Sequence, residues 1–211
     1  MSIYKPLMIS DFSQAVHVPM DGIIAVRECL PEIDEDVDRI LISPACLDAR
    51  IKALADQIRD HYHDHGELVM ITLLDGARPF SDALQRCIGD IPGTNVRRDT
   101  LRVKSYDGTA STGRYEVLKH LDIDIKGKHA LVIEDIIDTG GTLVFVNDYL
   151  RRKDPGSIQW AALLDKKVRP QMPRIKADFT GFIIPHEFVI GFGLDKDDDY
   201  RDLPYVGVYG G

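Results

Sequence analysis

Three carboxylates and two glycines stand together where an apolar run of the sequence ends. Residues 130–143 read ALVIEDIIDTGGTL, so that Glu134 and Asp135 follow four apolar residues and Asp138 comes three positions later. The next residues lead directly into a helical pattern. Glycines let successive backbone N–H groups converge, and a helix N-terminus adds positive potential, which together favour an anion. The sequence therefore predicts a phosphate seat made by Thr139, Gly140, Gly141 and Thr142.

The acid pair Glu134 and Asp135 lies one short loop away from this predicted seat. Carboxylates would repel a second phosphate, but they accept hydrogen bonds from vicinal sugar hydroxyls, directly or through Mg²⁺. A phosphate on one side and a diol on the other describe a 5-phosphoribosyl group. An ordinary acidic loop is the alternative interpretation. A Walker loop is excluded, because no Gly-Lys-Ser/Thr follows the glycines.

Strands and helices alternate along the chain on both sides of this segment. Helices are expected from Ser43 to a stop at Gly66, over residues 78–88 and over 143–152. Strands are expected over residues 68–74, 100–106, 130–134 and 158–164, and near 188–192. Such alternation predicts an α/β fold with a parallel sheet and helices on both faces. Because ligands bind beyond the carboxyl ends of parallel strands, the acid pair should lie at the rim of a site.

Composition and charge limit the classes of function. The chain has 211 residues, 44% of them hydrophobic and 28% charged, which fits one soluble globular domain. The formal net charge of -8 argues against a broad contact with nucleic acid or an anionic membrane. No leader or membrane-spanning segment is recognisable, so we expect a cytoplasmic protein. Cys29, Cys46 and Cys87 are spaced too widely for a disulfide framework or a thiolate metal site.

Three histidines, His61, His63 and His65, lie close together in the segment HYHDHGE. His61 and His65 share a helix face, so a metal site is one interpretation. The segment also fits the frayed end of a surface helix, where histidine suits the helix dipole. We favour the second interpretation, because a metal site needs a third committed ligand and a buried setting.

The segment VIEDIIDTGGT resembles the phosphoribosyl-pyrophosphate signature of the type I phosphoribosyltransferases, in the version found in the hypoxanthine-guanine enzymes. Further segments match in the family's order and spacing: VKSY at 103–106, ALLDKK at 162–167, ADFTGFIIP at 177–185, EFVIGFGLD at 187–195 and YRDL at 200–203. Together they cover most of the chain from about residue 68 onward. The first forty or so residues carry no recognisable motif.

The resemblance implies an enzyme of purine salvage. Such an enzyme transfers 5-phosphoribosyl from phosphoribosyl pyrophosphate to N9 of a 6-oxopurine, with Mg²⁺ as cofactor, and forms IMP or GMP and pyrophosphate. Hypoxanthine and guanine are the expected bases, and xanthine is left open. Asp138 matches the family's general base beside N7 of the purine. Glu134 and Asp135 would face the ribose hydroxyls and help to place the metal, while residues 139–142 would hold the 5'-phosphate.

The resemblance also implies which residues select the base. Lys166 matches the lysine that donates to the 6-oxygen, and a fixed ammonium there rejects adenine, whose 6-amino group is also a donor. Phe188 would stack on the base, and the backbone of Val189 would read its edge. A one-residue exchange of roles between Lys166 and Lys167 stays open.

Other matches concern pyrophosphate. Asp195 matches a carboxylate for a second Mg²⁺, and Arg201 matches an arginine that reaches pyrophosphate, whereas residues 197–199 are expected to be a solvated acidic loop. Relatives present backbone N–H groups through a non-proline cis peptide at the loop of Asp75 and Gly76, so we expect a cis bond between Leu74 and Asp75. Asp75 is the main departure, because vertebrate relatives carry lysine there.

A small polar segment, residues 105–113, follows the predicted strand that ends at 106. In the family the matching loop closes over the site and excludes water, which would intercept the reacting sugar. Lys104, Ser105 and Tyr106 are in register with that loop and are predicted to bind substrate. An ordinary connection between strands is the alternative. Arg102 and Lys104 could also steer pyrophosphate.

The resemblance implies a single phosphoribosyltransferase domain, with a parallel sheet core over about 40–185 and a small hood from about 1–39 and 186–211. It also implies a homodimer or homotetramer. A nucleotide-sensing regulator that binds nucleic acid on the same fold is the alternative function. The net charge of -8 and the lack of an N-terminal helix-turn-helix pattern argue against such a regulator.

Overall fold

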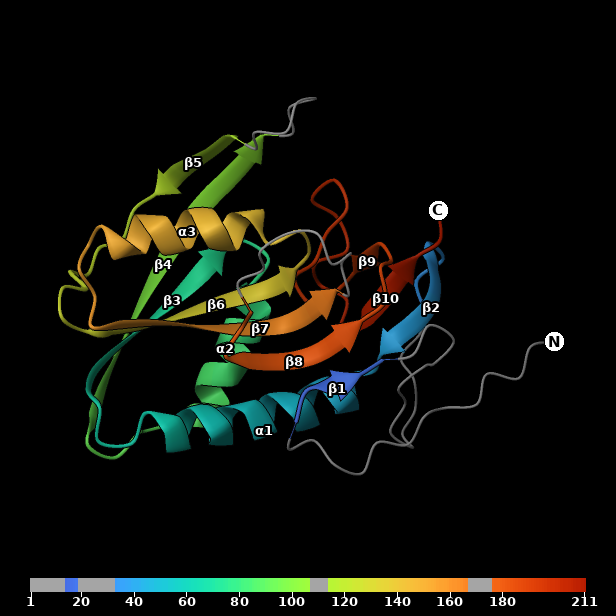
Figure 1. Ribbon diagram of the computed structural model, residues 1–211. Helices are drawn as coiled ribbons and strands as arrows, with labels where there is room; N and C mark the ends of the chain where they lie inside the picture. Colours follow the sequence, from blue (N-terminus) through green and yellow to red (C-terminus); the bar gives the residue numbers. More distant parts are fainter. Residues whose placement is uncertain (1–13, 19–32, 107–113, 167–175) are drawn as a thin grey trace.

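A seven-stranded sheet carries the site and is covered by helices on both faces (Figure 1). The computed structural model describes residues 14–18, 33–106, 114–166 and 176–211. In spatial order the strands of this sheet are β1 (Val16–His17), β8 (Phe179–Ile184), β7 (Ser157–Lys166), β6 (His129–Ile137), β3 (Gly66–Leu74), β4 (Thr94–Tyr106) and β5 (Arg114–Lys119). All neighbours pair in parallel except β4 and β5, which are antiparallel.

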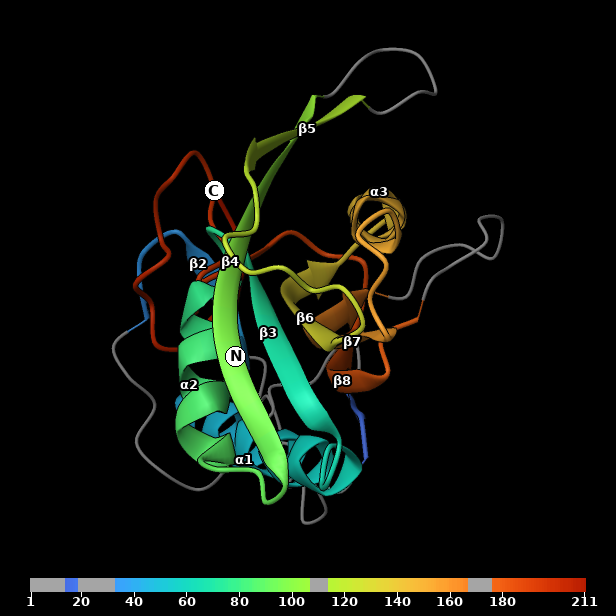
Figure 2. The ribbon, with the colours of Figure 1, turned by 90° about the vertical axis from the view of Figure 1, so that its left-hand side faces the viewer.

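The central strands are buried on both faces, which explains their continuous apolar runs. On one face, Leu131 and Ile133 of β6 pack in the core cluster that holds the helices α1 (Pro44–His61) and α2 (Arg78–Ile88). On the other face, Ala130 and Val132 pack with α3 (Gly141–Arg151). Figure 2 shows α1 and α2 on one side of the sheet and α3 on the other. Both predicted features, the parallel sheet and its two helical layers, are confirmed.

A second sheet lies beyond the carboxyl ends of β6, β7 and β8 (Figure 1). It is antiparallel, in the order β2 (Val37–Ile42), β10 (Val206–Tyr209) and β9 (Val189–Ile190). A small buried cluster of Val37, Ile40, Ile190 and Tyr205 holds its strands together. We call this three-stranded sheet the hood.

Local signals place the start of α1 and both ends of α2, but α1 ends at His61, before the stop expected at Gly66, which instead begins β3. Ser43 caps α1 by accepting a hydrogen bond from the N–H of Cys46 at 3.4 Å, and Pro44 occupies the first turn. The observed α2 spans residues 78–88, as predicted.

Several strands differ from the sequence-based expectation. β4 begins at Thr94 rather than near 100, because its polar first half is held by parallel pairing along the whole length of β3. β6 extends through the acid pair to Ile137. The strand expected near 188–192 is only β9, and it belongs to the antiparallel hood, while β8 takes the place in the main sheet. Val16 and His17, placed with the hood from the sequence, pair with β8 instead.

Two further observations concern the cysteines and the lengths of the apolar helices. Cys46 is buried and Cys87 is exposed, and both are free thiols. Cys29 lies outside the described residues. Among the helices of the described residues, none is both long enough and apolar enough to cross a membrane.

The central strand supports a stability prediction. Leu131→Ala removes a fully buried side chain from β6, and we expect the free energy of unfolding to fall by about 2–5 kcal/mol. Leu118→Ala, at a half-exposed position of β5, is the matched control and should cost less than about 1 kcal/mol. Urea unfolding followed by circular dichroism measures both. Equal losses in the two variants would contradict the assignment of β6 to the core.

Candidate active site

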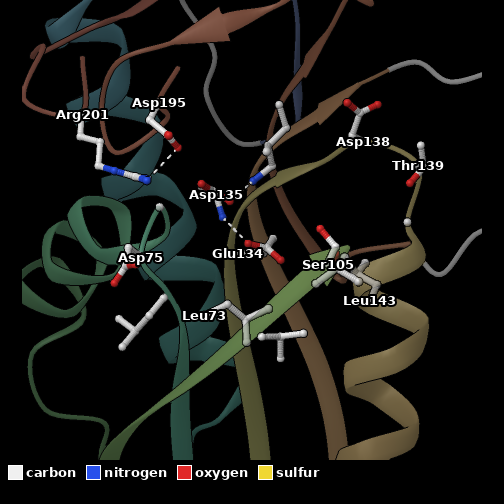
Figure 3. Close-up of a pocket in the computed structure, with 16 residues that line it drawn as sticks. Leu73, Asp75, Ser105, Glu134, Asp135, Asp138, Thr139, Leu143, Asp195 and Arg201 are labelled. Carbon is white, nitrogen blue, oxygen red and sulfur yellow. Dashed lines mark hydrogen bonds and ion pairs between the residues drawn. The ribbon is translucent and has the colours of Figure 1, made fainter. Parts of the chain in front are cut away.

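A cavity of about 420 Å³ opens at the carboxyl ends of β3 and β6. Figure 3 shows Asp195 and Arg201 on one side of it, Asp138 and Thr139 on the other, and the acid pair between them. The cavity gathers eleven of the residues predicted from the sequence: Asp75, Gly76, Ser105, Glu134, Asp135, Asp138, Thr139, Gly140, Thr142, Asp195 and Arg201. Apolar side chains that the sequence did not single out complete its lining, among them Leu73, Val103 and Leu143.

The loop between β6 and α3 turns through a left-handed glycine. Gly140 has φ of 83° and ψ of 3°, a conformation that other residues adopt only at a cost, and it precedes the first turn of α3. Thr139, Gly140 and Thr142 line the cavity, so this part of the predicted phosphate seat faces it. The first N–H groups of a helix have no partner within the helix and can bind an anion. Gly141 is outside the cavity lining and contacts β5 instead.

The acid pair is the most buried polar part of the cavity. Glu134 is 7% exposed, and the N–H of Asp135 donates to its Oε1 at 3.2 Å. The N–H of Ile136 donates to Oδ1 of Asp135 at 2.8 Å. Burial raises the pKa of Glu134, and the neighbouring Asp135 carboxylate raises it further. Burial also raises the pKa of Asp135. Both carboxylates are therefore costly to ionise until a cation or hydroxyl donors reach them.

The loop after β3 is pressed against this acid pair. A Cβ on Gly76 would lie 1.9 Å from Oδ2 of Asp135, and a Cβ on Gly193 would lie 2.1 Å from the carbonyl oxygen of Gly76. Only glycines allow this approach of three chain segments. The peptide bond between Leu74 and Asp75 is cis, as predicted.

The carboxylate of Asp75 forms an ion pair with Arg102 of β4. A second cavity, of about 670 Å³, adjoins the pair and includes Lys104, Ser105 and Arg201 in its lining. The negative charge of Asp75, which stands where vertebrate relatives carry lysine, is therefore balanced by the neighbouring guanidinium of Arg102. The cation comes from β4, the strand on which Arg102 and Lys104 were predicted to steer pyrophosphate.

A third cavity, of about 200 Å³, lies on the other side of Asp135 and Asp195. Its lining includes Lys166, Phe188 and Val189, the three residues predicted to select a base. Nζ of Lys166 lies 2.9 Å from Oδ2 of Asp138, which lines the first cavity. An ion pair therefore bridges the two cavities, which also share Asp135, Ile136 and Asp195.

The hood holds the Phe188 segment in place. Phe188 is 53% exposed, and its ring meets Tyr209 edge-on at 5.9 Å. The N–H of Tyr209 donates to the carbonyl oxygen of Phe188 at 3.0 Å. Nη2 of Arg39, on β2, donates to both carboxylate oxygens of Glu187 at 2.5 Å. Sequence reasoning missed Arg39, because it lies before the first recognisable motif and acts on a residue far along the chain.

Arg201 is held by several partners beside the first cavity. Its guanidinium lies 2.9 Å from Oδ1 of Asp195 and 3.0 Å from Oδ1 of Asp198, and it donates to the carbonyl oxygen of Gly193 at 2.9 Å. The N–H of Asp198 donates to Oδ2 of Asp195 at 2.9 Å. The acidic run was expected to be a solvated loop, and residues 197–199 are all exposed, as expected. Asp198 in addition contacts Arg201 and Asp195.

Carboxylate oxygens are the ligands that Mg²⁺ prefers, and Glu134, Asp135 and Asp195 supply them in one cavity. Within the ranges that the structure describes, no three His, Cys, Asp or Glu side chains are arranged as a ready metal cluster. Mg²⁺ commonly takes one or two protein carboxylates and completes its shell with waters and substrate phosphates, so the carboxylates that line the cavity are its candidate ligands.

Some of the residues singled out from the sequence do not line the candidate site, and others lie outside the described residues. Nε2 of His61 lies 2.9 Å from Oε1 of Gln159, and its ring stacks with that of His65 at 5.5 Å. The backbone of Tyr106 ends β4. Residues 107–113 of the predicted lid, and Lys167, the alternative to Lys166, lie outside the described residues.

Comparison with known proteins agrees with this geometry. The family model of the phosphoribosyl transferase domain matches residues 36–197. A hypoxanthine-guanine phosphoribosyltransferase of Streptococcus pyogenes is 38% identical over 177 residues, which cover 83% of this chain and 95% of the relative. The chain belongs to the phosphoribosyltransferase family.

Solved phosphoribosyltransferases share the fold as well. A hypoxanthine phosphoribosyltransferase from Staphylococcus aureus aligns with a TM-score of 0.76 and 35% identity, covering 82% of this chain and 92% of that chain. The hypoxanthine phosphoribosyl transferase of Trypanosoma cruzi aligns with a TM-score of 0.77 and 34% identity, covering 85% of this chain and 94% of that chain. The predicted fold class and family are therefore confirmed.

The buried acid pair leads to a pH-dependent stability prediction. Because folding raises the pKa of Glu134 and Asp135, their ionisation destabilises the folded state, and stability should fall as pH rises above about 4–5, where these carboxyls ionise in the unfolded chain. In ligand-free protein with a chelator, Glu134→Gln should be more stable than the parent at pH 8, and this gain should shrink at pH 5.

Urea unfolding at the two pH values measures the effect. Glu35→Gln, at an exposed position, serves as the control and should show no pH-dependent gain. A Glu134→Gln variant that is less stable than the parent at pH 8 would show that the carboxylate is stabilised by contacts stronger than its burial cost.

Proposed function

We propose that this protein transfers the 5-phosphoribosyl group of phosphoribosyl pyrophosphate to N9 of hypoxanthine or guanine, forming IMP or GMP and pyrophosphate. The observation that carries the proposal is the ion pair between Asp138 and Lys166 at 2.9 Å, which bridges the cavity of the phosphate loop and the cavity beside Phe188. The Streptococcus pyogenes relative, a hypoxanthine-guanine phosphoribosyltransferase by name, supports the same assignment.

The reaction replaces one bond at C1 of the ribose with another. The bond from C1 to pyrophosphate oxygen breaks, and its electron pair leaves with pyrophosphate, while the lone pair of N9 forms the new bond to C1. Asp138 accepts the proton that the base loses from N7. Glu134 and Asp135 lie where negative charge can stabilise the positive charge that develops on the ribose.

A bound purine would separate Lys166 from Asp138 and form hydrogen bonds with both side chains. Lys166 donates to the 6-oxygen, while the carboxylate of Asp138 turns to the N7 proton. Lys166 is 7% exposed, so an adenine 6-amino group that faced it would place donor against donor away from bulk water. Phe188 provides an exposed ring for stacking, and the backbone of Val189 reads the base edge.

The two phosphate groups have separate places in this proposal. Thr139, Gly140 and Thr142 bind the 5'-phosphate, with Gly141 completing the turn. The Asp75–Gly76 backbone and Arg201 bind pyrophosphate, with Lys104 and Ser105 of β4 beside them. Tyr106, the last residue of β4, is expected from the family resemblance to join them. One Mg²⁺ placed with the help of Glu134 and Asp135, and a second held by Asp195, would neutralise charge on the leaving pyrophosphate. A homodimer or homotetramer remains an expectation from the family resemblance, and a cytoplasmic location remains one from the sequence.

Steady-state assays with phosphoribosyl pyrophosphate and Mg²⁺ test the function. We expect turnover of hypoxanthine and guanine but not of adenine, and a fall in kcat of about 10²- to 10⁴-fold in Asp138→Asn, because a positioned general base contributes about this much. Asp148→Asn, at an exposed position of α3, is the matched control and should leave turnover unchanged. Binding of phosphoribosyl pyrophosphate without turnover of any purine would instead indicate the regulator.

The Arg39–Glu187 pair gives a second test of the base site. Arg39→Gln frees the segment that carries Phe188, so the KM for hypoxanthine should rise about tenfold while the KM for phosphoribosyl pyrophosphate changes little. Arg59→Gln, which breaks a surface ion pair on α1, is the control. An equal rise in both KM values would contradict a role confined to the base.

A further inference from the structure

Tyr115 of β5 stands against the first turn of α3, next to the phosphate loop. Its ring stacks on Phe145 with centroids 5.2 Å apart and an interplanar angle of 20°. β5 is the edge strand of the main sheet, and α3 covers one face of that sheet (Figures 1 and 2). Because Phe145 lies one turn along α3 from Gly141, the stack fixes where the phenol hydroxyl reaches.

The hydroxyl of Tyr115 occupies the space that a side chain at position 141 would need. A Cβ built on Gly141 would lie 2.0 Å from Oη of Tyr115 and 3.2 Å from its Cζ, whereas the next neighbour, Oγ1 of Thr139, lies at an ordinary 3.8 Å. The backbone of Gly141 is helical and lacks the positive φ of Gly140. A larger residue at 141 would therefore have to displace the Tyr115 hydroxyl, whereas the backbone conformation at this position does not demand glycine.

Tyr115 is also joined to a residue that lines the cavity. It pairs with Ser105 in the antiparallel register of β4 and β5, and Ser105 lines both the first and the second cavity. The side chain of Tyr115 thus contacts the phosphate loop, and its backbone pairs with Ser105, which lines the cavity. The side-chain contact is made at Gly141, which does not line the cavity itself, whereas its neighbours Gly140 and Thr142 do.

We propose that Tyr115 is a positioning residue that holds the Gly140–Gly141 turn in the conformation that binds the 5'-phosphate. The proposal rests on the proposed function for the identity of the ligand. Two adjacent glycines give a loop much conformational freedom, and ordering such a loop opposes binding. The stacked phenol removes part of that freedom before the ligand arrives, so its contribution should appear in phosphate-side affinity.

A double-mutant cycle tests the contact. Gly141→Ala should weaken binding of phosphoribosyl pyrophosphate about tenfold or more, because the new methyl group and the Tyr115 hydroxyl cannot share the same space. Tyr115→Phe alone should change binding by less than about threefold, since the stack remains. The double variant Tyr115→Phe/Gly141→Ala should recover to within about threefold of Tyr115→Phe.

A second variant tests the positioning itself. Tyr115→Ala should weaken binding of phosphoribosyl pyrophosphate about tenfold, with kcat and the KM for hypoxanthine little changed. Tyr149→Ala, a tyrosine at the far end of the same helix, is the matched control. Calorimetric titration of phosphoribosyl pyrophosphate without purine measures binding, and thermal unfolding confirms that each variant is folded.

The outcomes separate this proposal from the proposed function. Parent protein that binds phosphoribosyl pyrophosphate but turns over no purine would contradict the proposed reaction, while the binding cycle would still support or overturn the role of Tyr115. Gly141→Ala that is equally impaired with Phe at 115, or Tyr115→Ala that binds like the parent, would overturn the positioning role. Parent protein that does not bind phosphoribosyl pyrophosphate would overturn both.

Discussion

The contact between the Asp135 carboxylate and the backbone of Gly76 is the constraint on which the candidate site depends. This contact joins the loop after β3 to β6. The backbone of Gly193, which follows β9, packs against the same loop. A side chain at either glycine would force these segments apart. Close packing of this kind lets short loops from separate strands act as one rigid surface, so that the phosphate, sugar and base regions keep fixed relative positions.

Local signals explain why much of the core could be predicted from the sequence. Ser43, Pro44 and the apolar spacing that follows them define α1 without reference to the rest of the chain. The first half of β4 carries no such signal, because its residues are polar and its pairing with β3 holds it as a strand. The hood depends on strands from both ends of the described chain, and β9 has only two residues, so no local pattern could indicate that sheet.

The same distinction applies to the candidate site. The loop that contains Asp138 and Gly140 is contiguous, and the residues needed to interpret it lie side by side in the sequence. Arg39 and Tyr115 act through partners that are distant in the sequence, so their contributions depend on a fold that single residues do not reveal. Asp75 is intermediate: its departure from the vertebrate residue was visible, but its partner Arg102 required the pairing of β3 with β4.

The Asp75–Arg102 pair has a consequence for how the site responds to its surroundings. Both side chains are partly exposed, at 40% and 49%, so dissolved salt screens their attraction. An arginine held this loosely can exchange a carboxylate for a phosphate oxygen without first being desolvated. Ionic strength therefore acts on the entrance of the site, while the buried acid pair is shielded from it. Under the proposed function, added salt should weaken binding of pyrophosphate at this entrance more than it weakens the stabilisation of ribose charge by the acid pair.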